Sequence, residues 1–354
     1  MVLTTRDGIR FDVRCAPGED VLSAAARAGY VLPSMCQKGS CGACYATVEG
    51  AHELGEHSPQ ALPEKDRAAG ASLLCCTYPT EPLQVSLPFD GNRVIHGSVP
   101  ERRAQVLAVD AVSPDGLTVR VRLALEPDEV SGAAVEFESG QFVEVSLPGQ
   151  ELRRAYSLAN VANWDGEAEL LVRLQPGGWF SGILAGWLSD GFEDAQVVVR
   201  GPMGAFGLHE NGVRPRWFVA GGTGLAPLAS MVRRMSEWGD PQPVRIYLGV
   251  NAQPELPDLD LLPELAEAFD TLPDAALVPC VWHPDGAWDG MVGTPADALE
   301  KDLAELAAAS GGGPVDWPDL YVCGPPALVD AASRTAVDAG VPADQVHSER
   351  CLPS

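Results

Sequence analysis

The pattern of hydrophobic and polar positions changes twice along the 354 residues of the chain, and each change predicts a new architecture. The first part alternates over residues 3–14 with a turn at Asp7-Gly8, which indicates a pair of strands. Residues 18–29 have a helical spacing that ends at Gly29. A short helix among strands predicts a small α+β domain, which we place at residues 1–92.

The second part has the alternation of an antiparallel sheet. Apolar and polar residues alternate over 102–112 and 117–124, and turns rich in proline and glycine follow them. Further strands are expected at residues 141–147, 168–174 and 195–200. Short strands joined by tight turns predict an antiparallel β-barrel domain over residues 99–208.

In the third part, from residue 216 onward, strands and helices alternate. A strand is expected near residue 217, and further strands at 244–250, 276–282 and 319–323. The expected helices are residues 229–238, 260–269, 296–309 and 327–340. This alternation predicts a doubly wound, parallel-sheet domain over residues 214–354, in a multi-domain chain of α+β, β and α/β parts.

Length and composition suit several packed domains rather than one. Hydrophobic residues make up 46% of the chain, but no run of about 18 or more apolar residues could cross a membrane. The N-terminus has no basic segment before an apolar one, so a cytoplasmic protein is expected. The formal net charge of -25 argues against nucleic acids and membranes as partners, because both are bound through clustered Lys and Arg.

Three cysteines in one short loop, Cys36, Cys41 and Cys44, are followed by a fourth in the adjacent pair Cys75 and Cys76. This spacing is typical of a plant-type 2Fe-2S cluster, because one loop can wrap two bridged irons while the fourth thiolate arrives from another segment. Glycines between the cysteines allow backbone N–H groups to approach the sulfurs. A structural zinc site is the alternative, although zinc usually takes its cysteines from two Cys-x-x-Cys pairs and only one is present.

Only one of the two adjacent thiols is expected to reach the cluster, because neighbouring side chains of an extended segment point to opposite faces. The segment resembles that of plant-type ferredoxins, whose last ligand comes shortly before an aromatic-proline pair such as Tyr78-Pro79. This resemblance implies a β-grasp ferredoxin fold for the first domain and favours Cys75. The predicted metal ligands are Cys36, Cys41, Cys44 and Cys75.

Two segments of the predicted barrel have the chemistry of a flavin site. In residues 153–160, Arg154 can pair with a diphosphate and Tyr156 can lie against a flat heterocycle. Residues 175–182 place two glycines before a helix, whose first N–H groups can bind phosphate. Together they predict FAD, and they resemble the flavin signature of the ferredoxin-NADP reductase superfamily.

The superfamily resemblance assigns roles to these residues. It implies that Arg154 binds the FAD phosphates, that Tyr156 lies beside the isoalloxazine and that Ser157 hydrogen-bonds near its N5 atom. It also implies that the segment from Gly178 to Ser181 surrounds the pyrophosphate. The predicted flavin residues are Arg154, Ala155, Tyr156, Ser157, Gly178, Trp179, Phe180 and Ser181.

Two glycine-containing loops follow predicted strands of the third region, at the edge where doubly wound sheets bind dinucleotides. They are Gly221-Gly-Thr-Gly224, with Pro227 after it, and Cys323-Gly-Pro-Pro326. The superfamily resemblance implies that these loops hold the nicotinamide dinucleotide and that Cys323 helps to position its hydride-donating carbon. The predicted residues are Gly221, Gly222, Thr223, Gly224, Pro227, Cys323, Gly324 and Pro325.

NADH is expected in preference to NADPH. A 2'-phosphate usually needs Arg or Lys after the second strand, whereas residues 249–258 offer two acids and no base. A hydride delivers two electrons at once and a cluster of this type accepts one, and flavin can connect the two. The three sites therefore predict electron transfer from NADH through FAD to a 2Fe-2S cluster and then to an external acceptor.

The order of the domains resembles the reductase components of bacterial multicomponent oxygenases, above all those of soluble methane, propane and alkene monooxygenases. The segments that carry this resemblance are residues 204–208, 218–227, 231–238, 245–251 and 280–284. It implies an NADH-dependent oxidoreductase whose partner is a carboxylate-bridged di-iron hydroxylase. Two alternatives stay open. One is the reductase of a Rieske-type dioxygenase or a phenol hydroxylase, and the other is a flavin enzyme with a zinc docking module.

The tail departs from that family. Relatives carry an aromatic ring two positions after the tail glutamate, whereas this chain has Cys351 after Glu349. The resemblance implies that Ser157, Cys323 and Glu349 take part in hydride transfer. Without the aromatic ring we expect a less covered flavin, and therefore faster loss of electrons to oxygen than in relatives.

Overall fold

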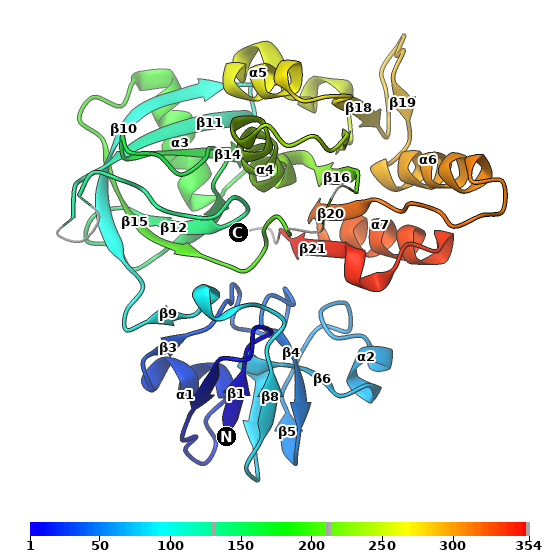
Figure 1. Ribbon diagram of the computed structural model, residues 1–354. Helices are drawn as coiled ribbons and strands as arrows, with labels where there is room; N and C mark the ends of the chain where they lie inside the picture. Colours follow the sequence, from blue (N-terminus) through cyan, green and yellow to red (C-terminus); the bar gives the residue numbers. More distant parts are fainter. Residues whose placement is uncertain (129–131, 210–211, 213, 352–354) are drawn as a thin grey trace. The chain divides into compact units, whose positions relative to one another are not determined.

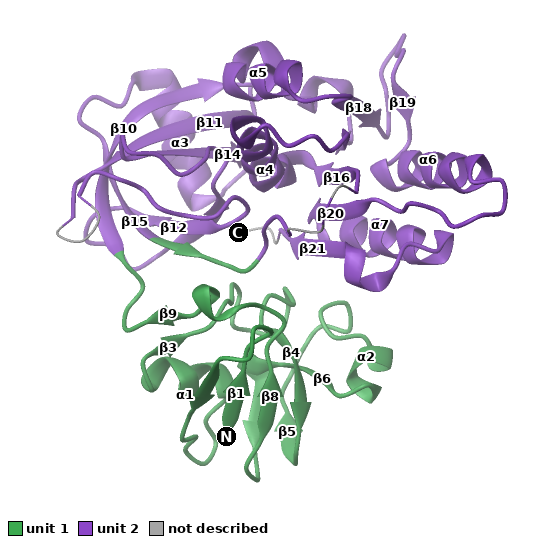
Figure 2. Ribbon diagram, viewed as in Figure 1, with its two compact units in different colours: residues 1–100, 201–205 green, residues 101–200, 206–354 purple. Residues whose placement is uncertain are grey.

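A computed structural model describes residues 1–128, 132–209, 212 and 214–351 of the chain. The chain separates into two compact units (Figure 2). Unit 1 comprises residues 1–100 and 201–205, and unit 2 comprises residues 101–200 and 206–354. The last three residues of the predicted third domain, 352–354, lie outside the described residues.

Unit 1 is built on a five-stranded mixed sheet with the strand order β2-β1-β8-β4-β6. β1 and β8 run parallel, and the other neighbours run antiparallel. Its strands are β1 (Val2–Thr4), β2 (Arg10–Asp12), β4 (Tyr45–Glu49), β6 (Ala71–Leu73) and β8 (Gln84–Ser86). Two further pairs join β3 (Tyr30–Val31) to β9 (Ile95–His96) and β5 (His52–Leu54) to β7 (Thr77–Pro79).

The main helix of unit 1, α1 (Val21–Arg27), begins at a capping residue. The side chain of Asp20 accepts a hydrogen bond from the N–H of Ser23, which has no acceptor within the helix. The apolar face of α1 packs into the core with Leu3 of β1. The unit also contains α2 (Glu64–Ala68) and the 3-10 turns η1 (Leu74–Cys76) and η2 (Gly91–Arg93). The predicted ferredoxin-like α+β fold is therefore confirmed.

The first half of unit 2 is a six-stranded antiparallel sheet with the order β13-β12-β15-β10-β11-β14. Its strands are β10 (Glu101–Ala111), β11 (Thr118–Leu125), β12 (Phe142–Ser146), β13 (Arg154–Ser157), β14 (Glu167–Arg173) and β15 (Gln196–Met203). A bridge between Leu158 and Leu170 links the two edges, so the sheet nearly closes into the predicted barrel (Figure 1). α3 (Trp179–Asp190) contributes Phe180 and Leu184 to the barrel core.

The second half of unit 2 is a six-stranded parallel sheet with the order β19-β18-β17-β16-β20-β21. Its strands are β16 (Arg216–Gly221), β17 (Val244–Val250), β18 (Ala276–Val281), β19 (Met291–Val292), β20 (Asp319–Gly324) and β21 (Val346–Arg350). The helices are α4 (Leu225–Trp238), α5 (Pro263–Thr271), α6 (Pro295–Ala309) and α7 (Pro326–Ala339). The 3-10 turns are η3 (Gly222–Gly224), η4 (Gln253–Glu255), η5 (Leu259–Leu261) and η6 (Ala343–Gln345).

Successive side chains of these strands enter two different cores, one on each face of the sheet. Phe218 and Tyr321 pack with residues of α4 and α5, whereas Val219 and Leu320 pack with residues of α6 and α7. Figure 1 shows α4 beside α5 and α6 beside α7. A parallel sheet covered on both faces is the predicted doubly wound arrangement.

A buried ion pair joins the barrel to the parallel sheet within unit 2. Nη1 of Arg233 in α4 donates to Oε1 of Glu169 in β14 and to the carbonyl oxygen of Ala159, both at 2.9 Å. The two charged side chains are each 7% exposed. Because removing one member would leave a buried charge without its partner, this contact ties the two halves of unit 2 together.

Two features of the parallel sheet differ from the sequence-based prediction. α4 begins at Leu225 rather than at residue 229, because Pro227 lies in its first turn, where the missing N–H is not needed. The sequence does not predict the two edge strands, β19 beside β18 and β21 beside β20. None of the helices within the described ranges combines the length and the hydropathy that a membrane crossing requires.

Candidate redox sites

The cysteine loop of unit 1 turns backbone N–H groups toward its sulfur atoms. It lies between β3 and β4, and the N–H groups of Lys38 and Ser40 both donate to Cys36 Sγ at 3.4 Å. Cys41 Sγ accepts from the N–H groups of Cys36 and Ala43, at 3.5 and 3.4 Å. Donors gathered around a sulfur stabilise the thiolate, which is the form that binds metal.

The other two predicted ligands meet near η1. Cys44 Sγ lies 3.3 Å from Cys75 Sγ, and the N–H of Gly39 donates to Cys75 Sγ at 3.3 Å. Cys76 behaves differently, because its thiol donates to the carbonyl oxygen of Glu56 at 3.2 Å. A thiol that donates to a carbonyl keeps its proton, so the surroundings favour Cys75 over Cys76 as a ligand.

The pKa values of these two neighbours move in opposite directions. Contact with Cys44 and the N–H of Gly39 lower the pKa of Cys75 to about 7, whereas burial raises the pKa of Cys76 to about 12. The two sulfurs lie 3.6 Å apart on a 3-10 turn rather than on an extended segment. The expectation that adjacent side chains here point to opposite faces is therefore wrong, and hydrogen bonding distinguishes the two thiols instead.

The space around Gly39 suits a sulfur-lined site. Its φ of +70° lies in the left-handed region, which favours glycine. A Cβ at this position would lie 2.7 Å from the carbonyl oxygen of Glu56 and 2.8 Å from Cys76 Sγ. Glycine therefore allows the close approach that brings its N–H to Cys75.

The four sulfurs fall into two contacting pairs, Cys36 with Cys41 and Cys44 with Cys75. A binuclear cluster takes two thiolates on each iron, whereas a structural zinc ion needs four around one point. The residues therefore fit a 2Fe-2S cluster better than the zinc alternative.

The two predicted flavin segments meet on the barrel of unit 2. β13 runs from Arg154 through Ala155 and Tyr156 to Ser157, and its four residues are half-buried. The ring centre of Tyr156 lies 5.6 Å from that of Phe180 in α3. The structure thus places the strand with the arginine and the tyrosine beside the helix that follows the glycine pair.

Gly178 and Ser181 shape the N-terminus of α3. Gly178 precedes the first helical residue, Trp179, and the hydroxyl of Ser181 accepts a hydrogen bond from the N–H of Gln175 at 3.0 Å. A Cβ on Gly178 would lie 3.0 Å from that hydroxyl, which is a tight contact. The first N–H groups of a helix have no acceptor within it, so this end suits an anion such as a phosphate.

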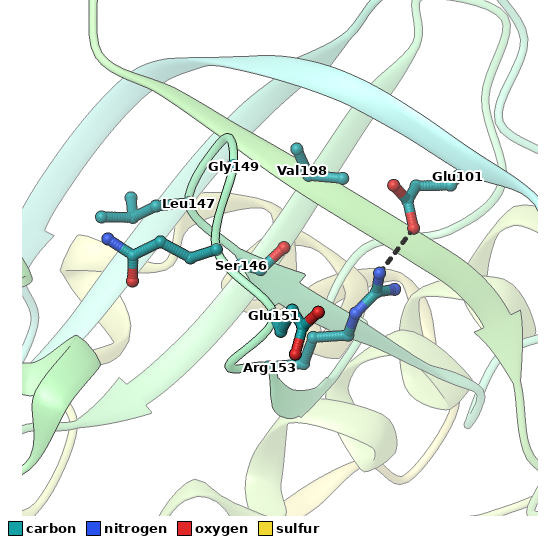
Figure 3. Close-up of a pocket in the computed structure, with 8 residues that line it drawn as sticks. Glu101, Ser146, Leu147, Gly149, Glu151, Arg153 and Val198 are labelled. Atoms are coloured by element: carbon teal, nitrogen blue, oxygen red, sulfur yellow. Dashed lines mark ion pairs between the residues drawn. The ribbon is translucent and has the colours of Figure 1, made fainter.

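A cavity of about 460 Å³ opens beside the hairpin of β12 and β13 (Figure 3). An ion pair between Arg153 Nη2 and Glu101 Oε2, 2.8 Å apart, forms part of its wall. The loop after β12 supplies much of the rest. Arg154 and the other predicted flavin residues are not among the lining residues, so the cavity adjoins the predicted flavin site and is not the site itself.

The two glycine loops of the parallel sheet lie against each other. A Cβ on Gly224 would overlap the carbonyl oxygen of Cys323, and a Cβ on Gly221 would lie 2.7 Å from Pro325. Glycine at 224 therefore allows close approach of the two backbones, and glycine at 221 leaves room for the side chains of Pro325 and Leu328. The neighbouring strands β16 and β20 and their following turns bring together Gly221, Gly222, Thr223, Gly224, Pro227, Cys323, Gly324 and Pro325.

Cys323 lies next to β21, the last strand of the chain that the structure describes. In the parallel register of β20 and β21 it is opposite Glu349, whose Oε2 atom is shielded from solvent and has no hydrogen-bond partner among the described residues. Burial raises the pKa of Glu349 to about 8. Cys351 Sγ lies 3.5 Å from Cys323 Sγ, a contact that sequence reasoning missed because it depends on the unpredicted strand β21.

The loop after β17 carries an acid at the position where a 2'-phosphate would need a base. Oε2 of Glu255 accepts a hydrogen bond from the N–H of Asn251 at 3.2 Å, which holds the carboxylate at the end of the strand. Its other oxygen, Oε1, lies 3.9 Å from Nη2 of Arg173, so an arginine partly balances the charge of this carboxylate. The preference for NADH over NADPH therefore stays a prediction from the sequence.

Comparison with known proteins finds three matching domain families. Residues 4–80 match a 2Fe-2S iron-sulfur cluster binding domain, residues 103–207 an oxidoreductase FAD-binding domain and residues 218–334 an oxidoreductase NAD-binding domain. The chain belongs to the family of flavin and iron-sulfur reductases that includes the reductase components of bacterial monooxygenases. It passes electrons from NADH through FAD to a 2Fe-2S cluster.

Several individual relatives match over almost the whole chain. The chain is 31% identical to the propane 2-monooxygenase reductase component of Gordonia sp. (strain TY-5), over 96% of this chain and 94% of the relative. It is 36% identical to methane monooxygenase component C of Methylosinus trichosporium, over 86% of both chains. A crystal structure of an Amycolatopsis cytochrome P450 reductase matches at a TM-score of 0.68, with 32% identity and 99% of both chains covered.

Proposed function

We propose that this reductase delivers its electrons to the di-iron hydroxylase of a soluble methane, propane or alkene monooxygenase. The observation that carries the proposal is the similarity to a propane monooxygenase reductase along 96% of the chain. A methane monooxygenase component supports it with 36% identity. The similarity to the propane monooxygenase reductase extends over the 2Fe-2S domain, which would pass electrons to the hydroxylase, as well as over the FAD- and NAD-binding domains.

The proposed NADH site is the pair of joined glycine loops. The loop from Gly221 to Gly224 opens α4, so free N–H groups at this helix end would hold the phosphates. Cys323 and Glu349 lie together at the same strand ends and would orient the nicotinamide. Residues 249–258, after the start of the second strand, contain no Lys or Arg that would bind a 2'-phosphate.

The proposed FAD site lies between β13 and α3. Arg154 would pair with the phosphates, Tyr156 would lie along the isoalloxazine, and Ser157 would hydrogen-bond near N5. The residues from Gly178 to Ser181 would surround the pyrophosphate at the N-terminus of α3. Flavin supplies the conversion of a two-electron hydride into single electrons.

The proposed cluster ligands are the sulfurs of Cys36, Cys41, Cys44 and Cys75. Backbone N–H groups already donate to three of them, Cys36, Cys41 and Cys75. These donors would stabilise negative charge on the sulfurs and so make the cluster easier to reduce. The loop would therefore both bind the irons and tune their potential.

A second class of acceptor is supported by one specific observation. The Amycolatopsis reductase that matches over 99% of both chains is described as a cytochrome P450 reductase. A haem protein is therefore the runner-up acceptor. We also propose a cytoplasmic location, supported by nine cysteines that form no disulfide in the structure and by the use of NADH.

The experiment that tests the acceptor is anaerobic electron delivery. The purified holoprotein and NADH would be mixed with a di-iron hydroxylase, a cytochrome P450 or a Rieske oxygenase component, and reduction of each metal centre would be followed spectroscopically. We expect the di-iron hydroxylase to be reduced fastest by at least about tenfold. Faster reduction of the P450 or of the Rieske component would contradict the proposal, although the route from NADH to the cluster would still stand.

A further inference from the structure

Two cysteines of unit 2 meet outside the cluster site. Cys323 ends the apolar run of β20 and is fully buried, whereas Cys351 follows β21 and is half-buried. Their Sγ atoms are 3.5 Å apart. The N–H of Cys351 donates to the carbonyl oxygen of Gly324 at 2.8 Å, which places Cys351 beside the end of β20.

The register of the two strands explains why these thiols face each other. Cys323 is opposite Glu349 in the parallel pairing, and Cys351 is two residues further along, so its side chain points to the same face of the sheet as that of Glu349. Of the two residues, only Cys351 is partly exposed to solvent, whereas Cys323 has none of its surface exposed. A small oxidant would therefore meet Cys351 first.

We propose that Cys323 and Cys351 form a peroxide-dependent disulfide that switches off the oxidation of NADH. In the first step, Cys351 Sγ attacks an oxygen of hydrogen peroxide, the O–O bond breaks, the thiol becomes a sulfenic acid and one water leaves. In the second step, Cys323 Sγ attacks Cys351 Sγ, the S–O bond breaks, and the hydroxyl leaves as water with the thiol proton. Two thiols and one peroxide thus become one disulfide and two waters.

The geometry permits this bond with a local movement. The sulfurs must approach from 3.5 Å to about 2.05 Å, and Cys351 follows the last residue of β21, so the end of the edge strand can supply the change. The cluster cysteines are not equivalent candidates. Backbone N–H groups donate to Cys36 Sγ and Cys75 Sγ, and the thiolates of this site are the proposed iron ligands.

The inhibitory effect rests on the proposed function, in which Cys323 touches the nicotinamide. Once tied to Cys351, its sulfur would be displaced from the strand end where the ring is proposed to bind. A shift on the scale of 1 Å at a reacting centre lowers rates by about a hundredfold. Oxidation would therefore stop electron entry, and a dithiol reductant would restore it.

The test uses the full holoprotein treated with stoichiometric hydrogen peroxide. Remaining thiols are alkylated, and the digested protein is searched by mass spectrometry for a peptide that links Cys323 to Cys351 and is two hydrogens lighter than its parts. NADH-driven ferricyanide reduction, which needs the flavin but not the cluster, is measured on the same sample. We expect the linked peptide, a loss of activity of at least about tenfold, and recovery with dithiothreitol.

The matched variant is Cys351→Ser, which keeps a small polar side chain and the cluster but cannot form the bond. It should retain untreated activity and resist peroxide. Equal inactivation of the variant, absence of the linked peptide, or a linked peptide with full activity would each overturn the proposal. If instead the untreated wild type failed to oxidise NADH, the proposed NADH site would fail, while the mass measurement would still report whether the disulfide forms.

Discussion

The two sulfur sites of the molecule differ in what surrounds the sulfur atoms. In unit 1, the N–H groups of Lys38 and Ser40 point at Cys36, and that of Gly39 points at Cys75. In unit 2, Cys323 faces the thiol of Cys351 and the buried carboxyl group of Glu349. Cysteines lie close together in both sites, so proximity does not distinguish them. The backbone N–H donors distinguish the proposed metal ligands from the pair that we propose forms a disulfide.

The surroundings also shift the pKa values of individual thiols in the two sites. Contact with Cys41 and the N–H groups of Ser40 and Lys38 lower the pKa of Cys36 to about 4. Contact with Cys351 and burial raise the pKa of Cys323. In the cluster site, the surroundings thus favour the thiolate at Cys36 and Cys75, whereas contact with these two sulfurs raises the pKa of Cys41 and Cys44.

The largest effect is expected from Gly39→Ala in unit 1. The added Cβ would meet the Glu56 carbonyl and Cys76 Sγ, and the positive φ would be strained, so the N–H would move away from Cys75. We expect the iron content to fall severely and NADH-driven cytochrome c reduction, which needs the cluster, to fall by about a hundredfold. Ferricyanide reduction should stay near the wild-type rate, and a parallel loss of both activities would contradict a local effect on the cluster.

Gly224→Ala is the corresponding glycine substitution at the proposed NADH site of unit 2. Its Cβ would overlap the carbonyl oxygen of Cys323 and push the two glycine loops apart. We expect kcat/KM for NADH in ferricyanide reduction to fall by about tenfold or more, with iron and sulfide unchanged. Loss of the cluster in this variant would show that the two sites do not respond independently.

Glu349→Gln is expected to change how stability depends on pH. The carboxyl has an ordinary pKa of 4.5 and a pKa of about 8 when folded, because burial disfavours its charge. The folded state therefore holds the proton more tightly, and the free energy of unfolding falls as pH rises from about 4.5 to about 8. The variant cannot ionise, so its Tm should match wild type near pH 5 and exceed it by several degrees at pH 8.5. Parallel Tm curves across this range would argue against a buried neutral carboxyl.

The smallest effect is expected from Cys280→Ala. Cys280 is fully buried, and its thiol donates to the Val278 carbonyl at 3.5 Å, with no role in either sulfur site. Urea unfolding should show a loss of about 1 kcal/mol from the smaller side chain. Iron content and both electron-transfer activities should be unchanged. A loss of iron here would mean that cysteines outside the loop also affect the cluster.

Local pattern predicts much of this architecture from the sequence. The expected strand at 244–250 coincides with β17, and the alternating segments of the barrel form its strands. Burial of one or both faces of a strand requires apolar residues at matching positions, and this pattern can be recognised in the sequence. β21 is not predicted, since Val346–Arg350 becomes a strand only by pairing with β20. Tertiary pairing here overrides a weak local signal.

The environment of the sulfurs is also non-local. The choice between Cys75 and Cys76 depends on the N–H of Gly39 and the carbonyl of Glu56, which come from distant parts of the sequence. Spacing indicates which cysteines gather, but the hydrogen bonds that separate a thiolate from a thiol arise only after folding. The contact of Cys323 with Cys351 is hidden for the same reason.

We propose above that Cys75 and the three loop cysteines hold the cluster that receives electrons from NADH. A comparison of Cys75→Ala with Cys76→Ala tests this most directly. Iron, acid-labile sulfide and the low-temperature EPR signal would be measured on anaerobic protein after NADH is added. We expect Cys76→Ala to keep about two irons per chain and the signal of a reduced 2Fe-2S cluster, and Cys75→Ala to lose both. A cluster retained in Cys75→Ala and lost in Cys76→Ala would contradict it.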